Sequence, residues 1–256
     1  MTVEYDGTEF CGFQWQPAVR TVASVLEEAL ATLFGAPVKV TSAGRTDSGV
    51  HASGQVISFS SERPFPFERL VQALNATLPA DLSVRDAALP TRGFSARFSA
   101  RERTYVYAVF NDAQRSALLG RYACHVPASL DVAAMRAAGA CFLGEHDFRS
   151  FGTCETGESF RRDIRRMAID PRGPLVRIEI AANGFLRHMV RTIVGTLLEC
   201  GRGRRDPGEI PDMLQAADRS VGGPTAPAHG LYLAGVRYDG YDSFSEPPLF
   251  RATDLA

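Results

Sequence analysis

The order of strand-like and helix-like segments is the feature of this sequence that most constrains its fold. In residues 22–34 the apolar side chains fall on one face of a helix, which Thr21 can cap and Gly35 ends. Residues 55–60 instead alternate apolar and polar side chains, as a half-buried strand does. The same two patterns of apolar residues can be followed through the rest of the first half. They predict the order β-α-β-β-α-β, over residues 3–5, 22–34, 38–41, 55–60, 67–78 and 82–88.

The second half of the chain repeats a similar succession. Strands are predicted over residues 104–110, 164–170, 175–181 and 231–238, and helices over 130–143, 184–200 and 207–217. Helices combined with antiparallel hairpins are typical of an α+β protein. Because the sequence has no obvious internal repeat, we predict the duplication from the order of elements alone.

This order divides the chain into four regions. We expect an N-terminal α+β half over residues 1–93, which carries a loop around Asp47, and a basic and aromatic connector with the first strand of the second half over residues 94–129. A C-terminal α+β half is expected over residues 130–240, followed by a surface tail over 241–256.

The composition of the chain is that of a soluble globular protein. Hydrophobic residues make up 45% and charged residues 22% of the sequence, which excludes disorder as the main state. The longest apolar stretches fall far short of the ~20 residues that a membrane helix needs, and the first residues do not resemble a secretory signal. We therefore expect a cytoplasmic protein that makes no contact with a membrane.

The sequence lacks the signatures of metal and cofactor sites. Its five cysteines are odd in number and never form C-x-x-C, and its histidines have no ligand-like spacing. It has no dinucleotide-binding G-x-G-x-x-G after a strand, no H-E-x-x-H and no G-x-S-x-G. We expect reduced thiols and a chemistry that uses neither metal nor cofactor.

Arginine is unevenly distributed along the chain. Lys39 is the only lysine among 28 basic residues, and residues 160–205 hold eleven arginines against four acidic residues, whereas residues 206–256 hold three against eight. The formal net charge of −1 gives no overall attraction to a polyanion, but a basic face balanced by an acidic periphery suits phosphate binding. The alternative is a merely solvated arginine face.

The segment Ala43–Ala52 carries the most chemical information. Gly44 and Gly49 permit backbone conformations and close approaches that a side chain would block. Arg45 lies two residues from Asp47, and an opposite charge so close favours the ionised carboxylate. A positioned carboxylate can be a nucleophile, a base or a metal ligand. The alternative is a turn in which Asp47 only accepts hydrogen bonds from the local backbone.

Arginines and aromatic side chains are interleaved between Phe94 and Tyr107. Rings on which a base can stack, next to guanidinium groups that hold phosphates, are typical of RNA-binding surfaces, so we expect Arg97 and Arg103 to contact RNA. Tyr105 and Tyr107 lie two apart on a predicted strand and share a face. Both could belong to the sheet core, or one phenol could point into a pocket.

The predicted helix over 184–200 carries two arginines near its start. Arg187 and Arg191 lie one turn apart beside His188 on a helix that is otherwise amphipathic. Arginine is seldom buried without an anionic partner, which Asp47 or a phosphate would supply here. We therefore expect Arg187, His188 and Arg191 to lie at the substrate site.

Taken together, these motifs resemble those of the tRNA pseudouridine synthase A family. Residues 43–52 resemble the family's catalytic motif, and six further segments between about residues 3 and 238 resemble its other signatures in the same order. These segments are Glu4–Thr8 with Gly12–Gln14, Leu74–Asn75 with Leu78–Pro79, Phe94–Tyr107, Gly144–Phe148 with Ser150–Phe151, His188–Arg191 with Gly195, and Gly230–Leu233. Seven motifs in register argue against a chance match.

The resemblance implies an enzyme that isomerises uridine to pseudouridine at positions 38, 39 and 40 in the anticodon arm of tRNA, without a cofactor. By their places in the motifs, Asp47 corresponds to the nucleophile, Arg45 to its neighbour, Tyr105 to the phenol in the pocket and Arg191 to the basic partner. Arg45 is then the side chain expected to fill the place of the extruded uridine, on which Tyr105 stacks. Attack on ribose, addition to uracil and elimination all remain open as routes.

The fold implied by the resemblance is α+β, with two ferredoxin-like halves that form a central mixed sheet with a cleft between them. Members of the family are homodimers that share a tRNA between subunits. Two other functions remain to be weighed: an RNA-binding or chaperone module that has lost activity, and a metal-assisted hydrolase that uses Asp47 with His51. His51 has no assigned role in the isomerase hypothesis.

Overall fold

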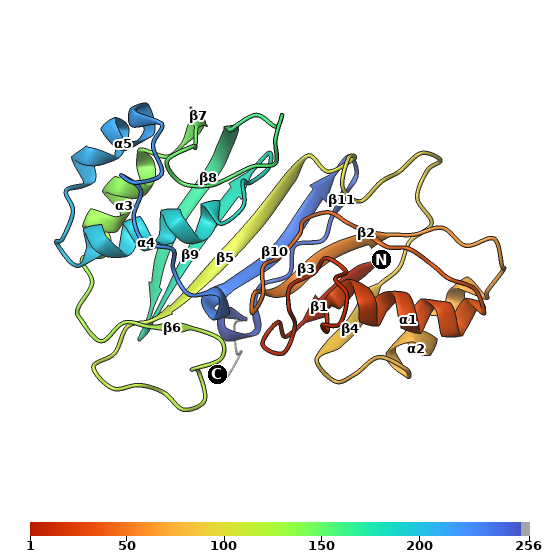
Figure 1. The fold of residues 1–256 in the computed structure, drawn as a ribbon. Helices are drawn as coiled ribbons and strands as arrows, with labels where there is room; N and C mark the ends of the chain where they lie inside the picture. Colours follow the sequence, from red (N-terminus) through yellow and green to blue (C-terminus); the bar gives the residue numbers. More distant parts are fainter. Residues whose placement is uncertain (252–256) are drawn as a thin grey trace. The chain divides into compact units, whose positions relative to one another are not determined.

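The computed structural model describes residues 1–251 and divides into two compact units. The first unit consists of residues 1–103 and of the chain from Tyr232 onward, and the second consists of residues 104–231 (Figure 1). The described residues form eleven strands and five α-helices. Each unit contains both parallel and antiparallel strand pairs, which confirms the expected α+β class with mixed strand pairing.

The first unit has the predicted order β-α-β-β-α-β. Its elements are β1 (Thr2–Tyr5), α1 (Val22–Phe34), β2 (Thr41–Ser42), β3 (His51–Ser58), α2 (Leu70–Asn75) and β4 (Leu82–Asp86), together with β10 (Leu231–Tyr238) and β11 (Tyr241–Asp242). The strand order is β4-β1-β3-β10, with β2 paired to β3 and β11 to β10. β1 is antiparallel to β3 and β4, whereas β10 is parallel to β3.

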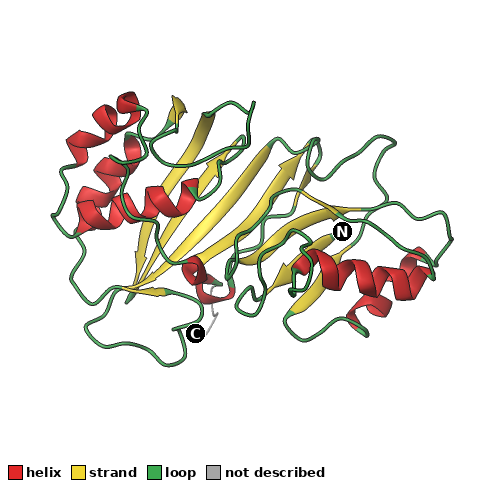
Figure 2. Ribbon diagram, viewed as in Figure 1, coloured by secondary structure: helices red, strands yellow, loops and turns green. Residues whose placement is uncertain are grey.

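Helix α1 has the limits that its sequence predicts. Ser24 N donates to Thr21 Oγ1 and Thr21 N to Ser24 Oγ, which forms a capping box, and Gly35 ends the helix with a φ of 62°. Leu26 and Leu30 are fully buried, which stabilises the unit by about 1.5–3 kcal/mol for each side chain. Helices α1 and α2 lie together on one side of the strands of this unit (Figure 2).

Two strands of the first unit begin elsewhere than expected. Val40 N and Lys39 Nζ donate to Glu27 of α1, and the strand that pairs with β3 is Thr41–Ser42. Strand β3 begins at His51, ahead of the alternating stretch over 55–60. It is buried on both faces, and a strand with two buried faces has no polar face to produce alternation.

The second unit is built around a long hairpin. Strands β8 (Arg161–Arg172) and β9 (Leu175–Ala182) are antiparallel, and the turn between them contains Gly173 with a φ of 59°. The strand order is β5 (Glu102–Phe110), β9, β8, β7 (Gly144–Asp147), and β6 (Cys124–His125) is parallel to β5. Helices α3 (Val132–Ala140), α4 (Met189–Gly201) and α5 (Ile210–Ala216) gather on one side of the hairpin (Figure 2).

Helix α4 begins at Met189 rather than at Gly184. Arg187 is paired in an isolated β-bridge and His188 has a φ of 63°, so neither residue has helical geometry. The helix is also buried on nearly all sides, whereas an amphipathic helix was expected. Neither α4 nor another helix within residues 1–251 has the length and apolar character that crossing a membrane requires.

The compact units do not follow the linear division of the chain at residues 93, 129 and 240. Strand β10 belongs with the first unit because Tyr232 pairs with His51 of β3. The expected surface tail begins with β11, which pairs with β10, and Ser243 and Phe250 are buried. Residues 252–256 of that tail lie outside the described residues.

Candidate active site

Asp47 lies in the loop over residues 43–50, which connects β2 to β3 in the first unit. Val50 N donates to Asp47 O at 3.1 Å, and Gly49 has a φ of 76°, a left-handed conformation that glycine adopts without strain. Asp47 is half-buried and Arg45 is exposed. Both residues therefore keep exposed surface, while hydrogen bonds hold the backbone of the loop that carries them.

A second loop packs against the backbone of the Asp47 loop. Phe13 N donates to Thr46 O at 3.0 Å, and Gly49 N donates to Phe10 O at 3.3 Å. Gly12, which lies between the two bonding residues, has a φ of 84°, and a Cβ at this position would lie 2.9 Å from Thr46 O. Glycine is therefore required here for the two loops to approach so closely.

Three buried polar side chains hold the Asp47 loop from inside the unit. The hydroxyls of Tyr5 and Thr46 are 2.8 Å apart, Gln55 Nε2 donates to Gly44 O at 2.7 Å, and Gln55 Oε1 accepts from Gly44 N at 3.4 Å. Burial raises the pKa of Tyr5 to about 12, so its hydroxyl remains protonated at neutral pH. Each of these polar groups thus has the partner that burial demands.

Arg103 and Arg97, the arginines of this unit expected to contact RNA, differ in what their side chains do. Arg103 Nε and Nη2 donate to Ala43 O at 3.2 and 3.0 Å, and Nη2 also donates to Arg97 O at 2.7 Å. The Arg103 guanidinium therefore holds the start of the Asp47 loop. The Arg97 guanidinium lies 5.3 Å from the centre of the Phe98 ring on the exposed surface, where a phosphate can reach it.

Tyr105 and Tyr107 lie on β5 in the second unit and have different surroundings. Tyr107 OH donates to Pro227 O at 2.9 Å, and burial holds the pKa of Tyr107 well above its ordinary value, so this phenol is a structural donor. The ring of Tyr105 lies edge-on to Phe185, with centroids 5.1 Å apart. Tyr105 is also buried, with 8% of its surface exposed.

Arg191 is fixed on α4 by a segment that crosses the helix. Arg191 Nε donates to Ala226 O at 2.8 Å, and Ala226 N donates to Arg191 O at 3.0 Å. The crossing segment lies directly on the helix backbone, because a Cβ at Gly195 would be only 1.7 Å from Pro224 O. Arg191 is half-buried, and its hydrogen bond to Ala226 O sets the direction of its side chain.

Arg187 and His188 lie in the chain just before α4. The backbone of Arg187 pairs with Thr153 in both directions, at 2.9 and 3.2 Å, and its side chain is exposed. His188 is half-buried, and its carbonyl accepts the first hydrogen bond of the helix from Thr192 N at 2.9 Å. The expectation that Arg187 and Arg191 lie one turn apart on a helix is thus wrong, since only Arg191 belongs to α4.

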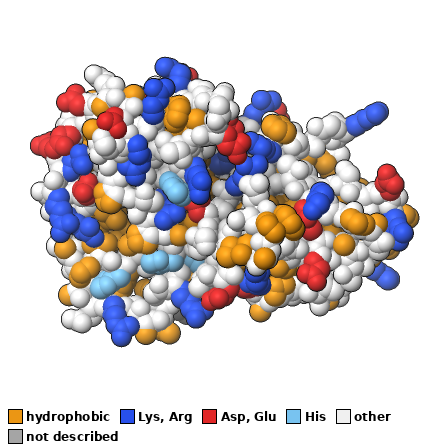
Figure 3. Space-filling model, viewed as in Figure 1, with side chains coloured by type: hydrophobic (Ala, Val, Ile, Leu, Met, Phe, Trp, Pro, Cys, Tyr) orange, Lys and Arg blue, Asp and Glu red, His pale blue; other side chains and the backbone are white. Residues whose placement is uncertain are grey.

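At least five of the eleven arginines over residues 160–205 form ion pairs with carboxylates. The ion pairs are Arg161 with Glu145, Arg165 with Asp163, Arg166 and Arg177 with Glu179, and Arg205 with Glu199. Figure 3 accordingly shows basic and acidic side chains interspersed on the face in view. The count of arginines along the sequence therefore overstates the basic surface available to RNA.

His51 takes part in the packing of the first unit. It is buried, its Nδ1 lies 3.0 Å from Gly7 N and 3.2 Å from Asp6 Oδ1, and its ring stacks on Tyr232 with centroids 4.8 Å apart. Within residues 1–251, no three His, Cys, Asp or Glu side chains are grouped as metal ligands. These contacts give the hydrolase hypothesis no support from His51.

The residues predicted for the site fall in both units. The first unit holds Arg45, Asp47, Arg97 and Arg103, and the second holds Tyr105, Arg187, His188 and Arg191. The sequence analysis missed Tyr5, Thr46 and Gln55. The alternating pattern over residues 55–60 predicts a half-buried strand in which polar side chains such as Gln55 face solvent, whereas β3 buries Gln55 completely, and its partners could not be named without the fold.

Comparison with known proteins gives a consistent result. A family model described as tRNA pseudouridine synthase matches residues 1–99 and 138–239. A protein of Caldicellulosiruptor saccharolyticus named tRNA pseudouridine synthase A is 42% identical over 241 residues, and one of Bacillus subtilis with the same name is 44% identical over 241 residues. Both alignments cover 93% of this chain and 98% of the relative.

One solved structure, titled "Crystal Structure of a Cbf5-Nop10-Gar1 Complex", aligns with 78% of this chain and 45% of its own chain at 12% identity. The TM-score is 0.35, which is too low to support a conclusion.

Proposed function

Since the chain belongs to the tRNA pseudouridine synthase family, and is therefore an isomerase that acts on uridine in tRNA, we propose that it modifies positions 38, 39 and 40 of the anticodon arm with Asp47 as its nucleophile. The observation that carries this proposal is the fixed loop around Asp47. A half-buried carboxylate lies on a backbone that is bonded to Tyr5, Phe13 and Gln55 through its neighbours. A loop held in this way keeps the backbone of Asp47 in one place, as a positioned catalytic group requires.

The reaction exchanges one bond of the ribose for another. The bond between ribose C1′ and uracil N1 breaks, a bond between C1′ and C5 forms, C5 loses its proton and N1 gains one. No atom is lost from the nucleoside, so a carboxylate that forms and later releases a covalent bond is sufficient in principle and no cofactor is consumed.

Arg45 suits the role of replacing the uridine in the RNA helix. A paired nucleotide must leave its stack before it reacts, at a cost of a few kcal/mol. Arg45 is exposed, follows Gly44 and lies two residues from Asp47, so its planar guanidinium can occupy the vacated place while Asp47 meets the extruded nucleotide. We assign stacking on the uracil to Tyr105, whose ring orientation is set by Phe185.

The remaining arginines would bind the tRNA backbone. Arg97 and Arg187 are exposed and therefore available to phosphates. Arg191, which is held by Ala226, is assigned the basic position next to the reacting nucleotide, and His188 adjoins the same helix start. Arg103 contributes mainly by holding Ala43, because its donors bond to the protein backbone.

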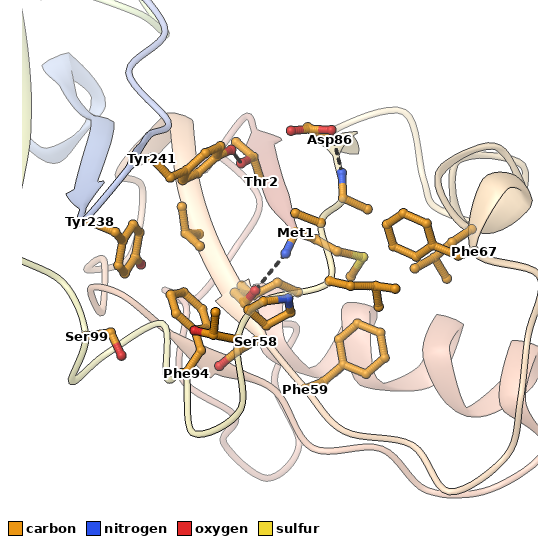
Figure 4. Close-up of a pocket in the computed structure, with 18 of the residues that line it drawn as sticks. Met1, Thr2, Ser58, Phe59, Phe67, Asp86, Phe94, Ser99, Tyr238 and Tyr241 are labelled. Atoms are coloured by element: carbon orange, nitrogen blue, oxygen red, sulfur yellow. Dashed lines mark hydrogen bonds between the residues drawn. The ribbon is translucent and has the colours of Figure 1, made fainter.

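We further propose that the enzyme is a homodimer in the cytoplasm and that it associates through an apolar hollow of the first unit. This hollow of about 840 Å³ lies at the far end of β3 from Asp47, and Figure 4 shows the rings of Phe59, Phe67 and Phe94 around it. Two of its apolar residues are strongly exposed, Phe98 at 79% and Leu89 at 78%. Large exposed apolar patches are typical of protein interfaces.

The charges around the hollow favour a second copy of the chain over RNA. Arg63 and Arg92 line it together with Asp86, while Arg101 is paired with Asp239 at 2.8 Å. A surface that carries both signs of charge can complement itself across a twofold axis. A phosphate backbone would gain little here, because the carboxylates offset most of the arginine charge.

A map of modified positions tests the proposed function. Unmodified tRNA is incubated with the enzyme, and pseudouridine is located by carbodiimide labelling and primer extension. We expect pseudouridine at positions 38, 39 and 40 with the wild-type chain and none with Asp47→Ala. Pseudouridine elsewhere in the tRNA would contradict the assignment to the anticodon arm, and modification by Asp47→Ala would contradict the role of Asp47.

A further inference from the structure

A buried polar cluster lies directly under the Asp47 loop. It consists of Tyr5 on β1, Gln55 on β3 and Thr46 in the loop, which are 3%, 0% and 6% exposed. Their surroundings are apolar: the ring of Tyr5 contacts the rings of Phe10 and Phe13, with centroids 6.3 and 6.4 Å apart. Polar groups in such a place are costly unless bonded, so the cluster has a specific geometry.

Gln55 bonds to the loop in place of another strand. Its side-chain amide donates to Gly44 O at 2.7 Å and accepts from Gly44 N at 3.4 Å, so it forms with Gly44 the pair of bonds that a neighbouring strand would form. The loop backbone therefore remains irregular at Gly44 although it lies against a buried strand. Gln55 Nε2 also approaches Tyr5 OH at 3.5 Å, which joins the two anchors.

Tyr5 supplies the second anchor of the loop. Its hydroxyl is hydrogen-bonded to Thr46 Oγ1 at 2.8 Å, and Phe13 N donates to the carbonyl of the same threonine at 3.0 Å. Thr46 is thus held by both its side chain and its backbone. Because Gly44 and Thr46 flank Arg45, and Thr46 precedes Asp47, the two anchors fix the backbone from which both functional side chains extend.

We infer that Gln55 and Tyr5 are positioning residues, which set the direction of Asp47 and Arg45 through Gly44 and Thr46. The inference rests on the proposed role of Asp47. Neither residue touches the reacting atoms in this account, so both act through the loop. A shift of about 1 Å in a catalytic group can lower a rate about 100-fold, and loss of these bonds allows a shift of that size.

The test compares Gln55→Met, Tyr5→Phe and Thr46→Val with the wild-type chain. Each variant keeps the approximate volume of the side chain and removes the side-chain hydrogen bonds by which the loop is joined to β1 or β3. With enzyme in excess over tRNA labelled with tritium at uridine C5, we expect the single-turnover rate constant of Gln55→Met to fall about 10- to 100-fold per folded molecule, with tRNA affinity changed less than about twofold. The single-turnover rate constants of Tyr5→Phe and Thr46→Val should also be lower than that of the wild-type chain.

Asn75→Leu is the matched control. Asn75 Nδ2 donates to Val84 O at 2.8 Å and Asn75 Oδ1 accepts from Val84 N at 2.7 Å, so it makes the same two-bond pair as Gln55 but joins α2 to β4, away from the loop. We expect Asn75→Leu to lose stability without change in the single-turnover rate constant. If the single-turnover rate constant fell equally in Asn75→Leu and Gln55→Met, the role of Gln55 would be structural only, and the inference would be overturned.

Gln55→Glu provides a rescue that depends on pH. A protonated carboxylic acid keeps one donor and one acceptor for Gly44, whereas a carboxylate cannot donate to Gly44 O. Relative to the wild-type chain at the same pH, the rate constant of Gln55→Glu should therefore rise as the pH is lowered, and that of Gln55→Met should not. The absence of such a rise in a folded Gln55→Glu chain would contradict the inference.

The result with Asp47→Asn separates this inference from the proposed function. If Asp47→Asn is inactive and folded Gln55→Met turns over at the wild-type rate, the positioning role fails while the nucleophile stands. If Asp47→Asn is active, the proposed function itself fails. Should Gln55→Met not fold, the decision passes to Tyr5→Phe and Thr46→Val, and wild-type rate constants in both would overturn the inference.

Discussion

Replacement of Gly12 by alanine tests whether the neighbouring loop holds the Asp47 loop in its working shape. Gly12 has a φ of 84°, and a Cβ at this position would lie 2.9 Å from Thr46 O, 3.3 Å from Ser48 N and 3.4 Å from the carbonyl carbon of Asp47. All three atoms belong to backbone, which cannot move aside as the end of a flexible side chain can. The new methyl group therefore presses on the residues that carry the carboxylate.

Two costs combine in Gly12→Ala. The left-handed backbone conformation costs alanine about 1–2 kcal/mol, and the overpacked contact with Thr46 costs about 1–3 kcal/mol more. Gly240→Ala is the matched control, because Gly240 has a φ of 79° and nothing within 4 Å of a built Cβ. It should lose only the first of these two amounts, so the difference between the variants measures the contact between the loops.

Urea unfolding and single-turnover kinetics together check this prediction. We expect Gly12→Ala to lose about 2–5 kcal/mol of unfolding free energy and about 100-fold in the single-turnover rate constant, whereas Gly240→Ala keeps the wild-type rate constant. The reasoning would be refuted by a Gly12→Ala chain that is as stable as Gly240→Ala and as active as the wild type. That result would mean that the two loops separate at no cost.

Three further predictions concern other parts of the molecule. Burial by itself raises the pKa of Glu179, but Arg177 and Arg166 outweigh it and hold the pKa below its ordinary value of 4.5, so the unfolded chain takes up this proton at a higher pH than the folded one does. The stability contributed by Glu179 should therefore be present above pH 4.5 and decline as the pH falls, and urea unfolding of Glu179→Gln should show a weaker decline; equal pH dependence in both chains would contradict the assignment. Tyr107→Phe should lose about 1 kcal/mol of stability and no activity, because it removes a hydroxyl that bonds only within the protein, to Pro227 O among others, whereas Tyr105→Leu, which removes the ring assigned to stack on the uracil, should lower the single-turnover rate constant; the reverse pattern would exchange their roles. Phe98→Glu should shift the chain from dimer to monomer in sedimentation without a change in its circular dichroism, and a dimer of unchanged stability would place the interface elsewhere.

The parts of the fold that local sequence determines were predicted correctly. Helix α1 has a capping residue, an apolar face and a terminal glycine within one short stretch, so its limits needed no information from elsewhere. The chain over residues 38–40 has an extended pattern as well, but Glu27 of α1 supplies its hydrogen-bond partners. Strand β10 pairs with β3 although the two are far apart in sequence. Such choices depend on tertiary contacts.

In the candidate site, too, the features that local sequence determines could be predicted, and those that depend on tertiary contacts could not. Asp47 and Arg45 could be named because the chemistry of the loop is written in consecutive residues. The anchor of the loop on Arg103 could not, because the acceptor is the carbonyl of Ala43, 60 residues earlier in the chain. The ion pairs of the arginines over residues 160–205 could not be predicted either, since Glu179 meets Arg166 only across the hairpin of β8 and β9. A count of charges along a sequence does not show which carboxylate lies next to which arginine in the fold.

The central claim is that the Asp47 carboxylate, held by a fixed loop, performs the isomerisation. Its most direct test is tritium release from C5-labelled uridine in tRNA under single-turnover conditions, with wild-type and Asp47→Asn chains compared after their tRNA affinities have been measured. Because the amide is nearly the same size but is not a nucleophile, we predict no release above background from Asp47→Asn and an affinity within about twofold of the wild type. Release at a rate comparable to that of the wild-type chain would contradict the account.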